Sequence, residues 1–194
     1  MTETILIFAS YLIGSLSAAI ITCRLMGLPD PRTQGSKNPG ATNVLRHGGK
    51  KAAAITLFGD AIKGVIPVVA AQLMGAPALI LAGVALAAFL GHLYPVFFNF
   101  RGGKGVATAF GVLVALAWPV GLALLATWLV MAKLFNISSL AALAAACLSP
   151  LYMWWLEPQP EFIIVSTVIS LLLLWRHRSN IRNLMAGTEG KIRE

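Results

Sequence analysis

Long apolar stretches separated by short polar segments dominate the pattern of this chain. Four of them contain no Asp, Glu, Lys or Arg, and they cover residues 4–23, 64–100, 105–132 and 134–156. A helix that crosses a bilayer needs about 20 consecutive apolar residues. The pattern therefore predicts an all-α, polytopic integral membrane helix bundle.

The breaks within these stretches set the limits of the predicted spans. The stretch after Lys63 is too long for one helix, and Gly75-Ala-Pro77 divides it. Residues 105–132 fit either one long tilted helix or two short helices divided at Trp118-Pro119. With that division the predicted segments are 4–23, 52–74, 78–99, the two halves of 105–132, 134–156 and 161–176.

The distribution of charge favours the division. With seven segments, every Lys and Arg except Lys63 falls in loops on one side. With six, the basic carboxyl end would lie opposite the basic first loop, against the positive-inside rule. We therefore predict seven transmembrane helices, an extracytoplasmic N-terminus and a cytoplasmic C-terminus, in a single membrane domain of residues 1–194. Whether the fourth and fifth segments each cross the membrane fully stays open.

The composition agrees with this class, because 58% of the residues are hydrophobic. The net charge of +8 has a plain origin, since basic cytoplasmic loops set topology and attract anionic lipid headgroups. No nucleic-acid partner is needed to explain it. Cys23 and Cys147 lie in separate apolar segments without a C-x-x-C pair, so we expect small core residues and no metal ligands.

A first polar island, residues 34–51, precedes the second segment on the predicted cytoplasmic side. It reads "QGSKNPGATNVLRHGGKK". Asn38-Pro39 is typical of a helix start, with Asn as the N-cap and Pro at the first helical position. Gly48-Gly49 is expected to end that short helix.

This short helix offers the residues of an anion site. Asn43 and Arg46 are three apart and would share a face. Ser36 and Lys37 lie just before the helix N-terminus, where backbone N–H groups bind anions. An ordinary cytoplasmic loop, with turn residues and topology-setting charges, is the alternative interpretation.

A second island lies within "YPVFFNFRGGKGVATAFG", residues 94–111. It is not a Walker A loop, because Phe98 and Gly105 break that pattern. The glycines of Arg101-Gly-Gly-Lys104-Gly105 would let the backbone approach an anion, and the following helix would point its N-terminus at it. The alternative is a tight turn with two snorkelling cations. We expect His92, before the loop, to be a structural residue.

A third island, residues 176–194, follows the last segment. His177 and Asn180 are three apart on its helical pattern. A basic stop-transfer flank would explain its arginines, but neither Asn180 nor the ending Gly187-x-Glu189.

Two further features lie outside the islands. Asn136-Ile-Ser138-Ser139 is expected to cap a helix N-terminus. Asp60 and Lys63 are ionisable residues within a predicted span, which is a functional indication by default. Because they lie three apart and can neutralise each other, we predict a structural ion pair that supports the site.

The residue types of the islands limit the chemistry. Acidic residues are nearly absent there, which argues against carboxylate-bound Mg²⁺ and against catalysis by two carboxylates. A surplus of fixed positive charge and N–H donors suits one or two phosphate-bearing substrates. We see no G-x-S-x-G elbow and no clear nucleophile, and we expect neither a metal nor a cofactor. Protein partners remain unknown from the sequence.

The segments "GSKNPGATNVLR", "GHLYPVFFNFRGGKGVAT" and "RHRSNIRNLMAGTE" resemble, in this order, the three motifs of the bacterial acyl-phosphate:glycerol-3-phosphate acyltransferase (PlsY) family. The resemblance covers essentially the entire chain. It implies a seven-helix enzyme of the bacterial cytoplasmic (inner) membrane, with the motifs facing the cytoplasm. Such an enzyme would transfer an acyl chain from acyl phosphate to the 1-hydroxyl of sn-glycerol 3-phosphate. The products would be lysophosphatidic acid, the first acylated intermediate of phospholipid biosynthesis, and phosphate.

The resemblance also implies roles for matching residues. Ser36 and Arg46 would be the functional pair of the first motif. His177 and Asn180 would be the polar pair of the third, with Glu189 structural. The phosphate-binding loop of the second motif would be Gly102, Gly103, Lys104 and Gly105.

Two positions depart from the family pattern. Lys37 stands where many members have Gly, and Asn183 stands where Arg is common. At both positions the role of the side chain therefore stays open.

The expected mechanism needs no acyl-enzyme, because acyl phosphate is a mixed anhydride with a good leaving group. The enzyme must bring two dianions together and place the hydroxyl near the carbonyl. We expect Lys104 and the glycine amides to bind phosphate, and Arg46 with Ser36 to bind glycerol 3-phosphate. His177 with Asn180 would orient it, and either His177 or a substrate phosphate oxygen would act as the base. The acyl tail would lie between helices, open to membrane lipid.

A transporter or flippase for a phosphorylated solute or lipid is the alternative from another class. Broken helices with glycine-rich N-termini suit that function too. However, the predicted extracytoplasmic loops hold no Lys or Arg, whereas transport would be expected to place polar groups on both sides or at the midplane.

Overall fold

A computed structural model describes residues 1–192, which are helical and contain no strand. Arg193, one of the basic residues assigned to the cytoplasmic side, lies outside them. The chain divides into two compact units, Met1–Leu116 and the remainder from Ala117 on. The first contains α1 (Thr2–Gly14), α2 (Ala18–Leu25), α3 (Ala41–Leu73), α4 (Ala78–Leu93), the 3-10 turn η1 (Val96–Phe98) and α5 (Val106–Leu116). The second contains α6 (Trp118–Phe135), α7 (Ser138–Leu156), α8 (Pro160–Arg176) and α9 (Arg178–Met185).

The predicted membrane class is confirmed by these helices. Four of them are long and apolar enough to cross a bilayer, and the number rises to six if each of two bent pairs counts as one span. The bent pairs are α1 with α2, at 43°, and α8 with α9, at 58°. The protein is therefore an all-helical, multi-pass membrane protein.

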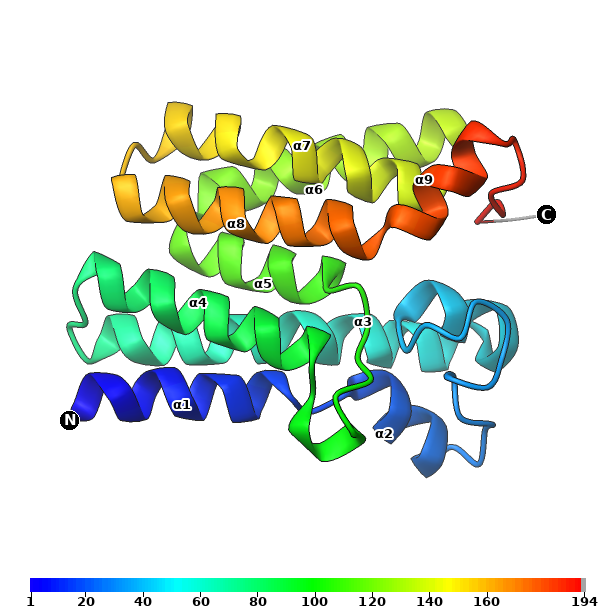
Figure 1. Ribbon diagram of the computed structural model, residues 1–194, viewed down its shortest axis with the longest axis horizontal. Coiled ribbons are helices and arrows are strands. Elements are labelled where there is room, and N and C mark those ends of the chain that lie inside the picture. Colours follow the sequence, from blue (N-terminus) through cyan, green and yellow to red (C-terminus); the bar gives the residue numbers. More distant parts are fainter. Residues whose placement is uncertain (193–194) are drawn as a thin grey trace. The chain divides into compact units, whose positions relative to one another are not determined.

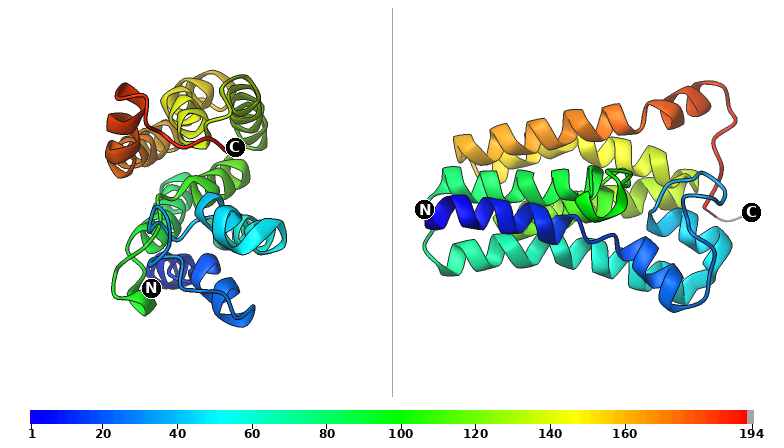
Figure 2. Two further views of the ribbon diagram at one scale, coloured as in Figure 1. Left: turned by 90° about the vertical axis from the view of Figure 1, so that its right-hand side faces the viewer. Right: turned by 60° about the horizontal axis from the view of Figure 1, so that its bottom comes forward.

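Helix α3 is the centre of the first unit, where it packs against α1, α2, α4 and α5 (Figures 1 and 2). Small residues bring α3 and α5 close together. A Cβ on Gly64 would lie 2.7 Å from the carbonyl oxygen of Thr108, and one on Gly111 would overlap the carbonyl of Ala61. This close backbone approach is the packing that small residues allow between membrane helices.

The first predicted segment is not the continuous helix expected over 4–23. It breaks at residues 15–17, between α1 and α2. Ser17 is the N-cap of α2, and its hydroxyl accepts from the N–H of Ile20 at 3.5 Å. The Lys63 ammonium donates to the carbonyl of Leu16 at 2.7 Å. A cation from α3 thus satisfies a carbonyl that a continuous helix would have bonded internally.

The predicted division of 105–132 is confirmed as a break between two helices. Ala117 is extended, with φ −149° and ψ 94°, and α6 begins with Trp118 and Pro119 in its first turn. Helix α5 has only 11 residues, so it rises about 16 Å. That is about half of a bilayer's hydrocarbon core.

The helix of the first island begins later than predicted. Asn38-Pro39 does not start it, because α3 begins at Ala41 with Gly40 as an extended N-cap. The expected end at Gly48-Gly49 is a kink: Gly49 has φ 81° and ψ 175°, and the helix resumes into the membrane segment. The island helix and the second predicted span are therefore one bent element.

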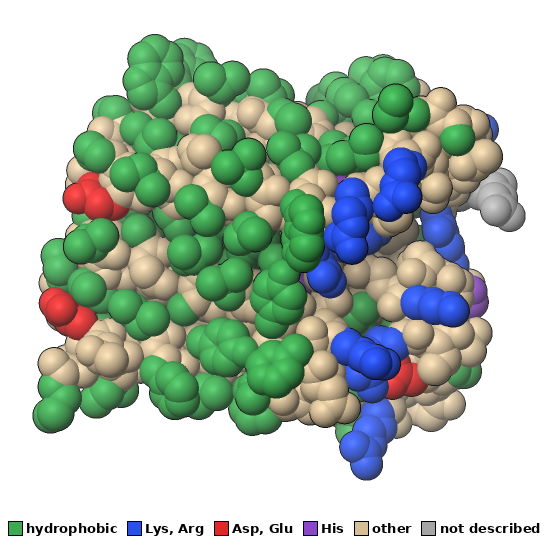
Figure 3. Space-filling view, viewed as in Figure 1, with side chains coloured by type: hydrophobic (Ala, Val, Ile, Leu, Met, Phe, Trp, Pro, Cys, Tyr) green, Lys and Arg blue, Asp and Glu red, His purple; other side chains and the backbone are tan. Residues whose placement is uncertain are grey.

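In the second unit, α7 packs against α6 and α8 (Figure 1). Helix α9 bends away from α8 at His177. Within each unit, the Lys and Arg side chains visible in Figure 3 gather at one end of the helices. In both units this is the end that carries the polar islands.

Candidate functional site

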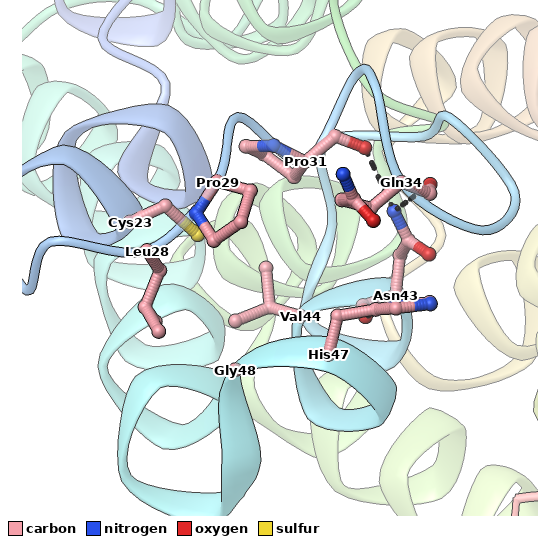
Figure 4. A pocket seen from close by; sticks show the side chains of 9 residues that line it. All are labelled: Cys23, Leu28, Pro29, Pro31, Gln34, Asn43, Val44, His47 and Gly48. Carbon is pink, nitrogen blue, oxygen red and sulfur yellow. Dashed lines mark hydrogen bonds between the residues drawn. The ribbon is translucent and has the colours of Figure 1, made fainter.

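Asn43 organises the loop of the first island. It is buried on the first turn of α3. Its Oδ1 accepts from the N–H of Ser36 at 3.2 Å, and its Nδ2 donates to three loop carbonyls at 2.9–3.1 Å. Those carbonyls belong to Pro31, Gln34 and Asn38. Figure 4 shows the bonds to Pro31 and Gln34. Asn43, which the sequence predicted to be a supporting residue, therefore fixes the conformation of the loop through buried hydrogen bonds.

Ser36 and Arg46 are exposed, unlike Asn43. The Asn43 amide fixes the backbone of Ser36, which leaves the Ser36 side chain at the surface. Arg46 lies one turn further along α3. The two residues that the first motif assigns to substrate are thus displayed on a loop and a helix that Asn43 ties together.

A small cavity lies beneath this loop, beside Asn43 and His47 (Figure 4). The His47 Nδ1 lies 3.1 Å from the carbonyl oxygen of Asn43. The cavity has a volume of about 10 Å³, room for one water molecule. It belongs to the support of the loop and cannot accept a substrate.

Lys37 has a left-handed backbone, with φ 57°. A residue with a Cβ is strained there, whereas glycine is not. This is the position at which the sequence departs from the glycine of many family members. The structure thus gives the departure a physical meaning, because glycine suits the turn and Lys37 adopts it under strain.

The glycines of the second island pack against the end of α4. A Cβ on Gly102 would overlap the His92 carbonyl, and one on Gly103 would overlap the His92 ring. Gly105 has φ 91°, and its α-carbon faces the Phe89 ring. The N–H of Gly103 donates to the His92 carbonyl at 3.3 Å. Glycine is therefore required here by contact with α4, a reason that the sequence did not reveal.

The N-terminus of α5 follows directly on this loop. Helix α5 begins at Val106, and the N–H of Ala109 donates to the Gly105 carbonyl at 2.7 Å. The N–H groups of the first turn have no partner within the helix, and they carry the positive end of the helix dipole. Lys104, half-buried, precedes them by two residues. This grouping has the chemistry of a phosphate site.

The first two islands are neighbours within the first unit. The Pro39 carbonyl lies 3.0 Å from the position that a Cβ on Gly103 would take. Arg32 Nη1 donates to the Phe98 carbonyl at 3.4 Å, which connects the two loops again. Residues about 65 positions apart in the chain are thereby brought to one place.

Asp30 holds Arg32 in that position. The guanidinium contacts both carboxylate oxygens, with the shortest distance 2.7 Å. The hydrogen bond from Arg32 is the main cause that keeps the pKa of the Asp30 carboxyl below its ordinary value. The pair therefore stays ionised at neutral pH.

The predicted ion pair between Asp60 and Lys63 is confirmed. Asp60 Oδ1 lies 2.8 Å from the Lys63 ammonium, and both side chains are buried. The carboxylate also lies 3.5 Å from Nδ1 of His92. Thr108 on α5 donates to the Asp60 carbonyl at 2.9 Å. The sequence missed His92 as a member of this group, because nothing in the local pattern connects α3 with α4.

His177 lies at the bend between α8 and α9, in the second unit, where it is buried. Its Nδ1 lies 2.8 Å from the Leu173 carbonyl. A carbonyl only accepts, so Nδ1 carries the proton in this bond. In the neutral ring Nε2 then has the lone pair that a general base needs.

Glu189 joins the third island to the start of α7. Its Oε1 accepts from Asn180 at 2.6 Å and from Ser139 at 2.7 Å. The N–H of Ile192 donates to the Asn136 carbonyl at 2.8 Å, which fixes the end of the same segment. The structural role predicted for Glu189 is thus supported by two charge-assisted bonds.

The predicted capping of α7 is wrong. Its N-cap is Ile137, whose side chain makes no capping hydrogen bond. Asn136 instead ends α6, in the left-handed conformation. Ser139 bonds to Glu189 of the third island, and Ser138, the supporting residue expected from the sequence, is the first residue of α7 beside it.

Within residues 1–192 there is no group of three or more His, Cys, Asp or Glu side chains that could hold a metal ion. The first two islands lie in the first unit, and the third lies in the second.

The sequence of this chain is similar to those of known membrane enzymes. Residues 4–187 match the sequence profile of a family described as glycerol-3-phosphate acyltransferase. A glycerol-3-phosphate acyltransferase of Methylococcus capsulatus is 55% identical over 190 residues, which cover 98% of this chain and 96% of that protein. One from Methylobacillus flagellatus is 57% identical, with 97% and 96% covered.

Two solved structures are similar along nearly the whole chain. Both are crystal structures of PlsY (YgiH), an integral membrane glycerol 3-phosphate acyltransferase. The glycerol 3-phosphate form has a TM-score of 0.94 and 38% identity, with 98% of this chain and 96% of that chain covered. The lysophosphatidic acid form has a TM-score of 0.92 and 36% identity, with 98% and 95% covered.

Proposed function

The chain belongs to the glycerol-3-phosphate acyltransferase family, and we propose that it transfers an acyl chain from acyl phosphate to the 1-hydroxyl of sn-glycerol 3-phosphate. The products are lysophosphatidic acid and phosphate. The proposed acceptor and the proposed lipid product correspond to the two solved forms of PlsY, one with glycerol 3-phosphate and one with lysophosphatidic acid. The transporter or flippase alternative is not favoured, because these relatives are acyltransferases.

One observation carries the chemistry: the first two islands adjoin in one unit, with the Pro39 carbonyl against Gly103. Such a junction can hold two phosphate groups side by side. Lys104 and the first turn of α5 bind the phosphate of the donor. Arg46 and Ser36 bind the phosphate of glycerol 3-phosphate. Fixed cations reduce the repulsion between two dianions and so raise the probability of their encounter.

The reaction is a direct displacement. The 1-hydroxyl oxygen attacks the acyl carbonyl carbon, the carbon–oxygen bond to phosphate breaks, and phosphate leaves with the bonding electrons. The hydroxyl proton passes to Nε2 of His177 or to a phosphate oxygen. Asn180, held by Glu189, orients the acceptor. Positive charge at Lys104 stabilises the charge that develops on the leaving phosphate.

The acyl tail and the topology belong to the same proposal. The tail lies between helices in contact with membrane lipid, with the site at the cytoplasmic face of the inner membrane. Seven spans place the N-terminus outside and the C-terminus in the cytoplasm. Reporter fusions test this arrangement: a periplasmic reporter is expected to be active at the N-terminus and inactive at the C-terminus, and the reverse result would overturn it.

The decisive test of the activity mixes purified protein, palmitoyl phosphate and glycerol 3-phosphate. Palmitoyl-CoA and palmitoyl acyl carrier protein serve as competing donors. Lysophosphatidic acid formed with acyl phosphate alone, in the presence of a metal chelator, is the expected result. Turnover only with the thioesters would overturn the donor assignment.

A further inference from the structure

The ring of His92 lies between a buried carboxylate and the glycine loop. His92 is on the last turn of α4 and is 6% exposed. Its Nδ1 lies 3.5 Å from Oδ1 of Asp60. Its Nε2 faces Gly103 so closely that a Cβ on that glycine would overlap it. The ring therefore spans the space between α3 and the loop.

The carboxylate determines how this ring is held. At 3.5 Å the two atoms face each other without forming a hydrogen bond. Because an ionised carboxylate only accepts hydrogen bonds, its charge favours the tautomer of His92 that carries a proton on Nδ1 and the ring plane that turns Nδ1 toward Asp60, as carboxylates do for histidines in other functional sites. The Lys63 ammonium, 2.8 Å from the same oxygen, keeps Asp60 in place.

The glycine loop rests on His92 at two points. The Gly103 N–H donates to the His92 carbonyl at 3.3 Å, and the Gly103 α-carbon lies against the ring. Gly103 immediately precedes Lys104. Any rotation of the ring would therefore shift the backbone from which the Lys104 side chain and the first turn of α5 extend.

We propose that Asp60 and His92 position the glycine loop for the phosphate of the acyl donor, an inference that rests on the proposed function. They are positioning residues, not catalytic ones. Asp60 orients the His92 ring, and contact with the ring fixes the position of the Gly103 backbone relative to α4. The geometry of the donor site then depends on Asp60, which lies in the membrane-spanning part of α3. The acceptor loop has its own support in Asn43, and it meets this device where the Pro39 carbonyl faces Gly103.

Kinetic constants separate this role from general packing. His92→Ala is expected to raise KM for palmitoyl phosphate by about tenfold to a hundredfold, because a misplaced binding loop loses such factors. KM for glycerol 3-phosphate is expected to change by less than about threefold. Thr56→Val is the matched control: Thr56 is fully buried one turn before Asp60, and its hydroxyl has no hydrogen-bond partner among the described residues.

His92→Phe distinguishes orientation by Asp60 from simple filling of space. It keeps a ring against Gly103 but removes the N–H toward the carboxylate. The expected result is a donor KM raised as in His92→Ala. A His92→Phe protein with wild-type kinetic constants would show that only volume matters at this position and would overturn the role of Asp60.

A double-mutant cycle tests the contact itself. Gly103→Ala places a methyl group on the ring, and removing the ring provides room for it. The fold increase in donor KM caused by Gly103→Ala is therefore expected to be smaller in a His92→Ala background than in the wild type. Equal increases in both backgrounds would overturn the proposal. If His92→Ala does not fold, as judged by thermal unfolding, His92→Asn takes its place because its amide keeps an N–H toward Asp60.

The wild-type protein separates the two possible failures. If it makes no lysophosphatidic acid from acyl phosphate, the proposed function is wrong. If it does so, and the cycle is additive with donor KM unchanged in His92→Ala, only the positioning role is wrong.

Discussion

Asn180 donates a hydrogen bond of 2.6 Å to Oε1 of Glu189, and Ser139 donates to the same oxygen. The Glu189→Ala substitution removes the carboxylate that accepts hydrogen bonds from Asn180 and Ser139. Hydrogen bonds to charged groups contribute about 1.5–3 kcal/mol each, so we expect a lower unfolding temperature and a kcat reduced about tenfold or more. Turnover and thermal unfolding of purified protein measure both.

Ser139→Ala is the control for that experiment. It removes one of the two bonds and leaves Asn180 bound to Glu189. Its stability is expected to fall while kcat stays near the wild-type value. If Ser139→Ala and Glu189→Ala lower kcat equally, the effect does not pass through Asn180.

Lys104 and Arg101 are two cations of one loop with different expected roles. Lys104→Met would remove the proposed charge-assisted contact with phosphate, and such a contact is worth about 1.5–3 kcal/mol. We therefore expect kcat/KM for acyl phosphate to fall by about ten- to a hundredfold. Arg101 is exposed, and Arg101→Met is expected to change kcat/KM less than about threefold. Equal losses in the two variants would indicate a general effect of loop charge.

The sequence predicted the helical membrane class and the break near Pro119 because both follow from local patterns. It also predicted the Asp60–Lys63 pair, since three residues along a helix bring side chains together. The sequence could not predict the contacts that Lys63, Asp60 and Glu189 make with residues distant in the chain. The Leu16 carbonyl, the His92 ring and the Ser139 hydroxyl reach their partners across distances of 32 to 50 residues in the chain. Such contacts are set by helix packing and leave no periodic signal.

The glycines of the second island illustrate the same limit. Their pattern predicted a close approach of the backbone to an anion, whereas the close neighbour that the structure shows at Gly103 is the His92 ring. Phosphate binding by the loop stays a prediction. Sequence spacing indicates that a Cβ is excluded, and it does not identify the atoms that exclude it.

Lys37 provides a test of backbone strain. At φ 57° a residue with a Cβ is less favourable than glycine by about 1 kcal/mol. Lys37→Gly is therefore expected to be more stable than Lys37→Ala, both variants lacking the charge. Thermal unfolding of the two proteins decides the matter, and a more stable alanine variant would contradict a strained turn.

The Asp30–Arg32 pair has a defined dependence on pH. The folded-state pKa of Asp30 is lowered, so its contribution to stability is present above the ordinary carboxyl pKa, about 3.9. The contribution disappears as the pH falls through the lowered value. Because the pair is partly exposed, we expect Asp30→Asn to cost about 1 kcal/mol or less at pH 7. Unfolding of the two proteins from pH 7 to pH 3 measures it, and a difference that grows on acidification would contradict the assignment.

Gly111 tests the close packing of α3 and α5. Gly111→Ala would place a methyl group on the Ala61 carbonyl, and overpacking of this kind costs about 1–3 kcal/mol. Gly83→Ala is the control, since the nearest atom to its Cβ is the flexible end of Ile7, at 3.2 Å. Thermal unfolding should show a clearly larger loss for Gly111→Ala.

The bond from Lys63 to the Leu16 carbonyl has a consequence for biosynthesis. Its two partners are 47 residues apart in the chain, so the first segment leaves the ribosome well before its cation exists. Until α3 enters the bilayer, a break in the first helix would expose a carbonyl that lipid cannot satisfy. The first span is therefore expected to stay beside the insertion machinery, or in contact with water, and to acquire its bent form only when Asp60 and Lys63 arrive together. A single cation thus imposes an order of assembly on the growing chain.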